Sequence, residues 1–362
     1  MIKRLQALPQ TQRTWAFFGL MLLFIVAFIA LGVLVLILIA RSSPRLTPFA
    51  LTNDVRVREF SILSDAQAYP ASLTLAPDGT LYTGSYVHGA IWRIAADGTA
   101  EELPNTRERI GSVTALKFAA DGNLYVLDRL APLYVLGAIV WRITPDGNLD
   151  DMLNLTGEWQ DTLQLPDDFA FDGQGNLYIS DRGQDAVWRW TAEQIEDEGA
   201  GAIWWRSPQL SDARAYAPTG LAYDAQNDAL LITDSLVDIL YSIPVNANDP
   251  ILESRALFNR RQQANSQPLG LDGVSVDETG NIYIAALAIN QIFRFTPEDS
   301  LWTPLAGNYR GASDVVYDGQ NQRLYVANWD QRSLLPLPVL FFNVPLDPHL
   351  PFSIDLIELG TP

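Results

Sequence analysis

The chain has 362 residues, 24 basic and 42 acidic side chains, and a net charge of −18. All 42 acidic residues follow residue 45, and so acidic a region argues against nucleic acid or anionic lipid as an electrostatic partner. The chain has no cysteine and only two histidines, which excludes disulfides, thiolate zinc sites, cysteine catalysis and a three-histidine metal site.

The N-terminal region contains a candidate membrane anchor. Residues 1–14 form a short tail, and residues 15–40 are 26 residues without a charge. A helix of that length is roughly 39 Å long, and it can cross a hydrocarbon core of about 30 Å. The alternative is a cleaved signal peptide, but an apolar core of about 7–15 residues is normal there, and residues 38–40 are a poor cleavage site. We therefore predict an uncleaved transmembrane anchor.

The charges that flank this run suggest its orientation. Three basic side chains precede the run and two follow it, namely Lys3, Arg4 and Arg13, then Arg41 and Arg45. This small bias favours a cytoplasmic N-terminus. Residues 41–54 are predicted to be an extended linker, because prolines at positions 44 and 48 prevent the helix from continuing. The acidic domain of residues 55–362 then lies outside the cytoplasmic membrane.

That domain contains six copies of one pattern. Each copy reads as an apolar strand, a turn rich in Asp, Gly and Asn, a second strand, a short loop, a third strand and a weaker fourth. Turn residues that accept positive φ permit tight hairpins, and four antiparallel strands every 40–50 residues or so are typical of a β-propeller blade. We predict an all-β fold, a six-bladed β-propeller of four-stranded antiparallel blades, over residues 55–362. Equivalent residues of the copies are 43, 53, 53, 52 and 42 positions apart: Leu81, Leu124, Leu177, Leu230, Ile282 and Leu324.

The sequence leaves the closure of the ring open. Residues 55–62 and 353–359 both alternate like strands, and we expect one of them to complete the sixth blade as its outer strand. Residues 333–342 are apolar and contain two prolines, and we interpret them as an irregular third strand of that blade. The alternative is an exposed apolar patch that contacts a partner, a membrane or a ligand.

Two residue patterns recur at one place in each repeat and are expected to be structural. Trp-Arg pairs such as Trp92-Arg93 suit a third strand that buries its aromatic side chain and points its arginine outward. Asp128, Asp181 and Asp234 recur at the end of the second strand, where aspartate side chains commonly accept hydrogen bonds from backbone N–H groups.

Four other aspartates are candidates for function. Asp167, Asp168, Asp272 and Asp314 precede or begin inner strands, so a propeller brings them to one mouth of its central channel. Oxygen ligands that converge from different blades suit a hard cation such as calcium. The alternative is that these carboxylates cap turns or bind backbone donors of the next blade.

Two segments carry a family resemblance. Residues 166–181 (PDDFAFDGQGNLYISD) and residues 271–285 (LDGVSVDETGNIYIA) resemble the six-bladed propellers of the NHL-repeat and gluconolactonase type, which includes senescence-marker and paraoxonase-like proteins. The resemblance covers about residues 55–342. It implies the same fold, but this fold is shared by many activities.

The lactonase and paraoxonase-like branches hold a catalytic divalent cation, usually calcium. The resemblance implies that Asp272 is the aspartate ligand and that Asp167 stands where an asparagine ligand is expected. Thr219 stands at the other asparagine position, and Ala71 stands at the position of a ligating glutamate. Asp168 and Asp314 are further candidate ligands. Because a charged oxygen is missing at Ala71, the sequence departs from the hydrolytic pattern.

An apolar loop over residues 130–136 lies on the same predicted face. Its side chains Leu130, Leu133, Tyr134 and Leu136 are candidates for contact with a partner protein, a membrane or a small apolar ligand, and a self-packed loop is the alternative.

Two functions remain in view. The first is a membrane-anchored extracytoplasmic propeller that acts as a binding or scaffold module, with no certain cofactor. The second is a calcium-dependent lactonase or esterase in which Asp167 and Asp272 hold the metal and His88 is the base.

Overall fold

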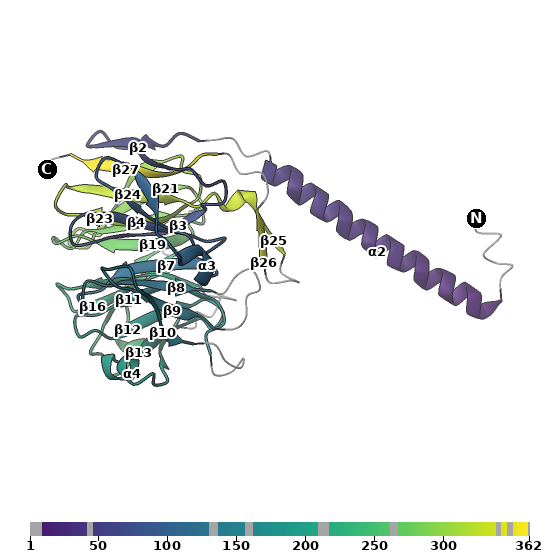
Figure 1. Ribbon diagram of the computed structural model, residues 1–362, viewed down its shortest axis with the longest axis horizontal. Helices are drawn as coiled ribbons and strands as arrows, with labels where there is room; N and C mark the ends of the chain where they lie inside the picture. The colour runs from purple at the N-terminus through teal and green to yellow at the C-terminus, as the bar shows by residue number, and fades with distance from the viewer. Residues whose placement is uncertain are drawn as a thin grey trace.

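The computed structural model describes residues 9–41, 46–129, 137–155, 162–208, 217–260, 267–337, 342–345 and 350–360. Helix α2 (Gln10–Arg41) projects from a disc of β-sheets (Figure 1). Its segment Gln10–Val35 is long and apolar enough to cross a membrane, as an anchor or as a signal sequence, and none of it is buried.

The disc is a six-bladed β-propeller, as the repeats predict. Each blade is an antiparallel sheet of four main strands, and the inner strands of neighbouring blades contact one another around a central channel. Blade 1 is β3 (Pro70–Leu75), β4 (Leu81–Ser85), β5 (Ile91–Ile94) and β6 (Ala100–Glu102). Blade 2 is β7 (Val113–Phe118), β8 (Leu124–Asp128), β9 (Ile139–Ile143) and β10 (Leu149–Asn154). Blade 3 is β11 (Pro166–Phe171), β12 (Leu177–Asp181), β13 (Ala186–Trp190) and β14 (Ala202–Arg206).

The second half of the ring has the same construction. The inner strand of blade 6, β23, contacts β3 of blade 1 and so closes the circle. Blade 4 is β15 (Pro218–Asp224), β16 (Ala229–Asp234), β17 (Ile239–Pro244) and β18 (Arg255–Asn259). Blade 5 is β19 (Leu271–Val276), β20 (Ile282–Ala286), β21 (Gln291–Thr296) and β22 (Leu301–Gly307), with β1 (Phe49–Ala50) at its edge. Blade 6 is β23 (Ala312–Asp318), β24 (Arg323–Asn328), β27 (Phe352–Leu359) and β2 (Val55–Leu63).

Few helices accompany these strands in the described part of the chain. The short helices α3 (Thr106–Arg109), α4 (Ala192–Glu196) and α5 (Pro250–Glu253) lie in connections between strands, and the 3-10 turn η2 (Gln331–Ser333) follows blade 6's second strand. A separate hairpin of β25 (Leu334–Leu337) and β26 (Phe342–Pro345) comes next.

The prediction that one terminal strand completes blade 6 as its outer strand is confirmed, because β2 is outermost and pairs with β27. The other terminal strand, β27, also enters this blade and pairs with β24 as its third strand. The interpretation of residues 333–342 as the third strand of this blade is therefore wrong. Pro336 lies in β25 and cannot donate a backbone hydrogen bond, which suits this short, separate hairpin better than a central strand.

The repeated turn has a physical basis in an Asp–Tyr pair. In blade 3, Asp172 accepts hydrogen bonds from the N–H groups of Gln174 (2.9 Å) and Asn176 (3.0 Å), and the hydroxyl of Tyr178 donates to it at 3.0 Å. In blade 5, Asp277 accepts from Tyr283 in the same way. One carboxylate thus fixes the turn and joins it to the strand that follows.

The two patterns expected to be structural are confirmed. Trp92 is buried, whereas the side chain of Arg93 is 53% exposed. Asp181 is fully buried and accepts from the backbone N–H groups of Gln164 and Leu165 at 2.8 and 2.9 Å, which ties the end of β12 to the segment that leads into β11. Asp128 and Asp234 bind backbone donors in the same way.

Candidate functional site

The candidate site is the channel mouth at which the inner strands begin. Every inner strand has an irregular register there, as between Pro166 and Phe169 in β11 and between Leu271 and Val274 in β19. Such bulges re-aim side chains and are common beside functional sites. The residues within them line a small cavity of about 40 Å³. A water molecule needs about 10–15 Å³ measured in this way, so the cavity has room for two or three.

The structure brings the four predicted carboxylates together. Asp167, Asp168, Asp272 and Asp314 all line this cavity, together with Ala71. The four aspartates come from blades 3, 5 and 6, and Ala71 comes from blade 1. A Cβ atom at Gly273 would collide with the side chain of Asp314, so glycine at this position allows blades 5 and 6 to approach closely.

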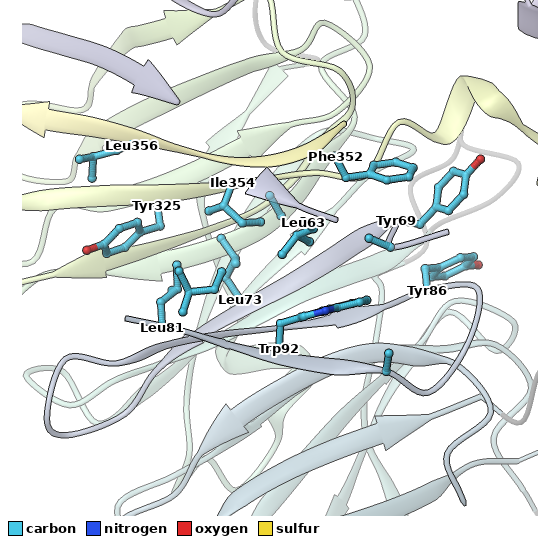
Figure 2. Close-up of a cluster of buried hydrophobic side chains, with 14 of the residues drawn as sticks. Leu63, Tyr69, Leu73, Leu81, Tyr86, Trp92, Tyr325, Phe352, Ile354 and Leu356 are labelled. Carbon is cyan, nitrogen blue, oxygen red and sulfur yellow. The ribbon is translucent and has the colours of Figure 1, made fainter. Parts of the chain in front are cut away.

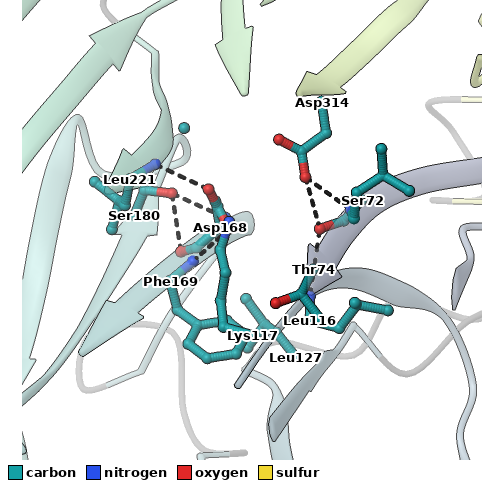
Figure 3. Close-up of polar contacts among 12 residues, drawn as sticks. Ser72, Thr74, Leu116, Lys117, Leu127, Asp168, Phe169, Ser180, Leu221 and Asp314 are labelled. Carbon is teal, nitrogen blue, oxygen red and sulfur yellow. Dashed lines mark hydrogen bonds and ion pairs between the residues drawn. The ribbon is translucent and has the colours of Figure 1, made fainter. Parts of the chain in front are cut away.

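Asp168 and Asp314 join neighbouring blades. Asp168 accepts a hydrogen bond from the N–H of Leu221 in the next blade at 2.9 Å, and Asp314 accepts one from the N–H of Leu73 in blade 1 at 2.8 Å (Figure 3). The hydroxyl of Ser72 also donates to Asp314 at 3.0 Å. For these two residues the structure shows the alternative in which the carboxylates bind backbone donors of the next blade.

A lysine inside the channel faces these carboxylates. The Nζ atom of Lys117, on β7, lies 3.3 Å from Oδ1 of Asp168, and its side chain is 20% exposed. Burial alone would lower the pKa of Lys117, but the charges of Asp168 and Asp314 outweigh it and raise that pKa. Lys117 is therefore a stable cation at neutral pH.

An arginine interacts with the other two carboxyl groups, those of Asp167 and Asp272. The Nη1 atom of Arg182 lies 3.4 Å from Oδ1 of Asp167, and the charges of Asp167 and Asp272 raise the pKa of Arg182 although burial opposes them. Burial and then the charge of Asp167 raise the pKa of Asp272 well above its usual value. Among the described residues, Asp272 is the cavity carboxylate with no direct hydrogen-bond donor.

Two aromatic residues complete the mouth. Tyr86 and Trp329 line the cavity with their ring centroids 4.6 Å apart, in an edge-to-face arrangement. The hydroxyl of Tyr86 accepts a hydrogen bond from Arg129 at 2.9 Å. The indole Nε1 of Trp329 is buried and has no hydrogen-bond partner in the described part of the chain.

His88 is on the same face but outside the cavity. Its Nε2 atom lies 3.2 Å from Oδ2 of Asp65 and 3.0 Å from Nη1 of Arg107, and its Nδ1 atom accepts from the N–H of Ala90 at 3.2 Å. Burial, and then the charge of Arg107, lower the pKa of His88. The described residues that line the cavity include no histidine, so the structure does not bring His88 to the carboxylates.

The geometry does not fit the divalent cation that the family resemblance implies. Calcium takes about 6–8 oxygen ligands. Here Asp168 and Asp314 are engaged by backbone donors and Lys117, Asp167 pairs with Arg182, and Ala71 supplies no side-chain oxygen. Within the described ranges, no three or more Asp, Glu or His side chains are placed to share one ion.

Lys117 and Arg182 were not predicted as site residues. Lys117 is the sole lysine after residue 3, and it interrupts the apolar residues Leu116 and Phe118 of an inner strand. This isolated charge is the sequence feature that could have identified Lys117 as a site residue. The proposed contact residues Leu130, Leu133, Tyr134 and Leu136 lie outside the described residues.

The family follows from comparison with known proteins. Residues 87–329, about two thirds of the chain, match the model of the SMP-30/gluconolactonase/LRE-like region. The chain belongs to this family. No curated protein matches it.

Solved structures show the same fold at low identity. A gluconolactonase from Xanthomonas campestris is 14% identical with a TM-score of 0.60, and the match covers 88% of this chain and 99% of that one. A virginiamycin B lyase from Staphylococcus aureus is 15% identical with a TM-score of 0.56, covering 84% and 99%.

Proposed function

We propose that this SMP-30/gluconolactonase-like propeller is a membrane-anchored, extracytoplasmic binding module that works without a resident divalent cation. The observation that carries the proposal is the pairing of Lys117 with Asp168 and of Arg182 with Asp167. These two basic side chains supply positive charge to two of the carboxylates that are candidate metal ligands.

The channel mouth favours a particular kind of ligand group. Four carboxyl groups outnumber the two basic side chains, and burial already opposes a negative charge on Asp272, so an anionic ligand is disfavoured at this mouth. Tyr86 and Trp329 add aromatic rings, which attract cations and pack against apolar groups. The mouth is best suited to a group that carries a positive charge or hydrogen-bond donors, on either a protein side chain or a small ligand. Asp272 would accept a hydrogen bond from that group.

Binding at this mouth is testable by site-specific crosslinking in intact cells. We expect a photoreactive residue that replaces Trp329 to give a discrete crosslinked product. The same residue in place of Tyr223, which lines the opposite end of the channel, should give none. Identical products from the two positions would contradict a binding site at the mouth.

The hydrolytic alternative is tested by lactone hydrolysis with the purified full chain in detergent. We expect no calcium-dependent rate above background, because Lys117 and Arg182 already neutralise part of the carboxylate charge. A calcium-dependent rate that Asp272→Asn abolishes would instead support a metal-dependent lactonase. Loss of that rate in His88→Gln, with calcium binding retained, would assign His88 as its base.

A further inference from the structure

The N-terminal helix leaves the propeller on the side of the channel mouth. The C-terminal end of α2 lies against η2 and β25, and Figure 1 shows α2 running away from the disc on that side. Trp329, which lines the cavity, is two residues before η2. The anchor and the candidate site therefore share one face of the propeller.

The linker holds that face close to α2. The backbone of β1 pairs with β22, and the side-chain amide of Asn308 donates to the carbonyl oxygen of Thr47 at 2.9 Å. Only residues 42–45 separate the end of α2 from residue 46. The five steps from residue 41 to residue 46 reach at most roughly 18 Å, at about 3.5 Å each. A bilayer crossed by α2 is consequently near the channel mouth.

The hairpin β25–β26 has a composition suited to that bilayer. Its two strands, LLPL and FNVP, contain no charge, and they form a sheet apart from the six blades. The first residue, Leu334, is buried in the cluster between blades 6 and 1, and the preceding Ser333 hydrogen-bonds to Tyr69 at 2.8 Å. These contacts fix the start of the hairpin to the propeller.

The opposite face has a different character. Its tight turns carry an aspartate in every blade, namely Asp78, Asp121, Asp172, Asp224, Asp277 and Asp318. Asp172, Asp224, Asp277 and Asp318 are buried, whereas Asp78 and Asp121 are exposed and would be repelled by anionic lipid headgroups. These exposed carboxylates make the opposite face less suited to an anionic membrane surface than the uncharged hairpin is.

We propose that the hairpin β25–β26 lies in the interfacial layer of the membrane that α2 crosses, so that the channel mouth faces the lipid. This inference rests on the membrane anchoring in the proposed function. The attraction is apolar rather than electrostatic, which agrees with the acidity of the domain. A ligand or partner then reaches Asp272 and Trp329 from the space between the propeller and the bilayer.

The inference is tested with single-cysteine variants, which the cysteine-free chain permits. The full chain is reconstituted in nanodiscs of phosphatidylcholine and phosphatidylglycerol, and each cysteine carries an environment-sensitive fluorophore. Leu335→Cys and Val344→Cys report on the two strands of the hairpin. Phe24→Cys reports on α2, and Ala96→Cys, in an exposed turn of the opposite face, is the matched control.

We expect blue-shifted emission at positions 335 and 344, with at least threefold stronger quenching by headgroup-proximal spin-labelled lipid than at position 96. Position 24 should be quenched by spin labels deep in the acyl chains. If position 24 is quenched while 335 and 344 behave like 96, the inference fails and the anchor stands. If position 24 is not quenched, the membrane anchoring itself is wrong. Two hairpin reporters keep the test decisive should one variant fail to fold.

Discussion

Deletion of residues 350–362 is expected to abolish the cooperative thermal unfolding of the propeller. β27 is the third strand of blade 6, and its loss leaves β24 with an open edge and β2 without a partner. Phe352, Ile354, Leu356 and Ile357 are fully buried in this strand. Burial of four such side chains is worth roughly 6–12 kcal/mol, which is comparable with a whole domain's stability of about 5–15 kcal/mol.

The closure cluster in Figure 2 explains why the effect spreads beyond one blade. Leu63 of β2 and Ile354 of β27 pack with Leu73 and Trp92 of blade 1, so the two ends of the chain join the last blade to the first. Circular dichroism and tryptophan fluorescence of the full chain in detergent would follow unfolding.

Point variants in β27 test the same account with smaller expected effects. Ile354→Ala should lower the free energy of unfolding by about 2–5 kcal/mol. Glu358→Ala in the same strand, whose side chain is 45% exposed, should change it by no more than about 0.5 kcal/mol. A cooperative transition in the deletion variant near the wild-type midpoint would contradict this account of ring closure.

Replacement of Lys117 by methionine is expected to lower the free energy of unfolding by about 3–5 kcal/mol at pH 8. Methionine is unbranched like lysine and removes the charge, although its side chain is one heavy atom shorter. Asp168 and Asp314 then keep their negative charges inside the channel without the facing ammonium group. Arg93→Met, which removes an exposed cation paired with Glu101, is the control and should leave the free energy of unfolding nearly unchanged.

The loss caused by Lys117→Met should shrink on acidification. Burial and, to a lesser degree, Asp314 raise the pKa of Asp168 to about 6, whereas an unfolded aspartate titrates near about 3.9. A group whose pKa is raised by folding contributes its full stabilisation at a pH below its pKa in the unfolded chain. This stabilisation is lost as the pH rises through its pKa in the folded protein. Removal of Lys117 raises that pKa further, so the deficit should be larger at pH 8 than at pH 5.

A second substitution completes this test. Lys117→Met combined with Asp168→Asn should recover part of the lost stability, because the uncompensated charge is removed with its partner. Equal losses at both pH values, or no recovery in the double variant, would show that Lys117 acts through packing alone.

The blades can be predicted from local sequence because each repeat contains the residues that fix its turn and set the two faces of its strands. The Asp172–Tyr178 pair fixes a turn, and burial of Trp92 against exposure of Arg93 sets the faces of a strand. The gathering of Asp167, Asp168, Asp272 and Asp314 followed from their common place in the repeat.

The remaining features depend on contacts between distant segments. Closure by both β2 and β27 is decided by pairing between the two ends of the chain, which no local pattern records. The pairing of Lys117 with Asp168 joins different blades, and the separation of His88 from the cavity depends on its contacts with Asp65 and Arg107. Identifying the candidate carboxylates in the sequence therefore does not identify the basic residues that pair with them.

The central claim, that the chain's own cations take the place of a divalent metal, is tested most directly by a calcium titration of thermal unfolding. The full chain in detergent is melted with chelator and with millimolar calcium. Because a ligand that binds the folded state alone must raise the midpoint, the account predicts the same midpoint in both conditions. A calcium-dependent rise that Asp272→Asn removes would contradict it.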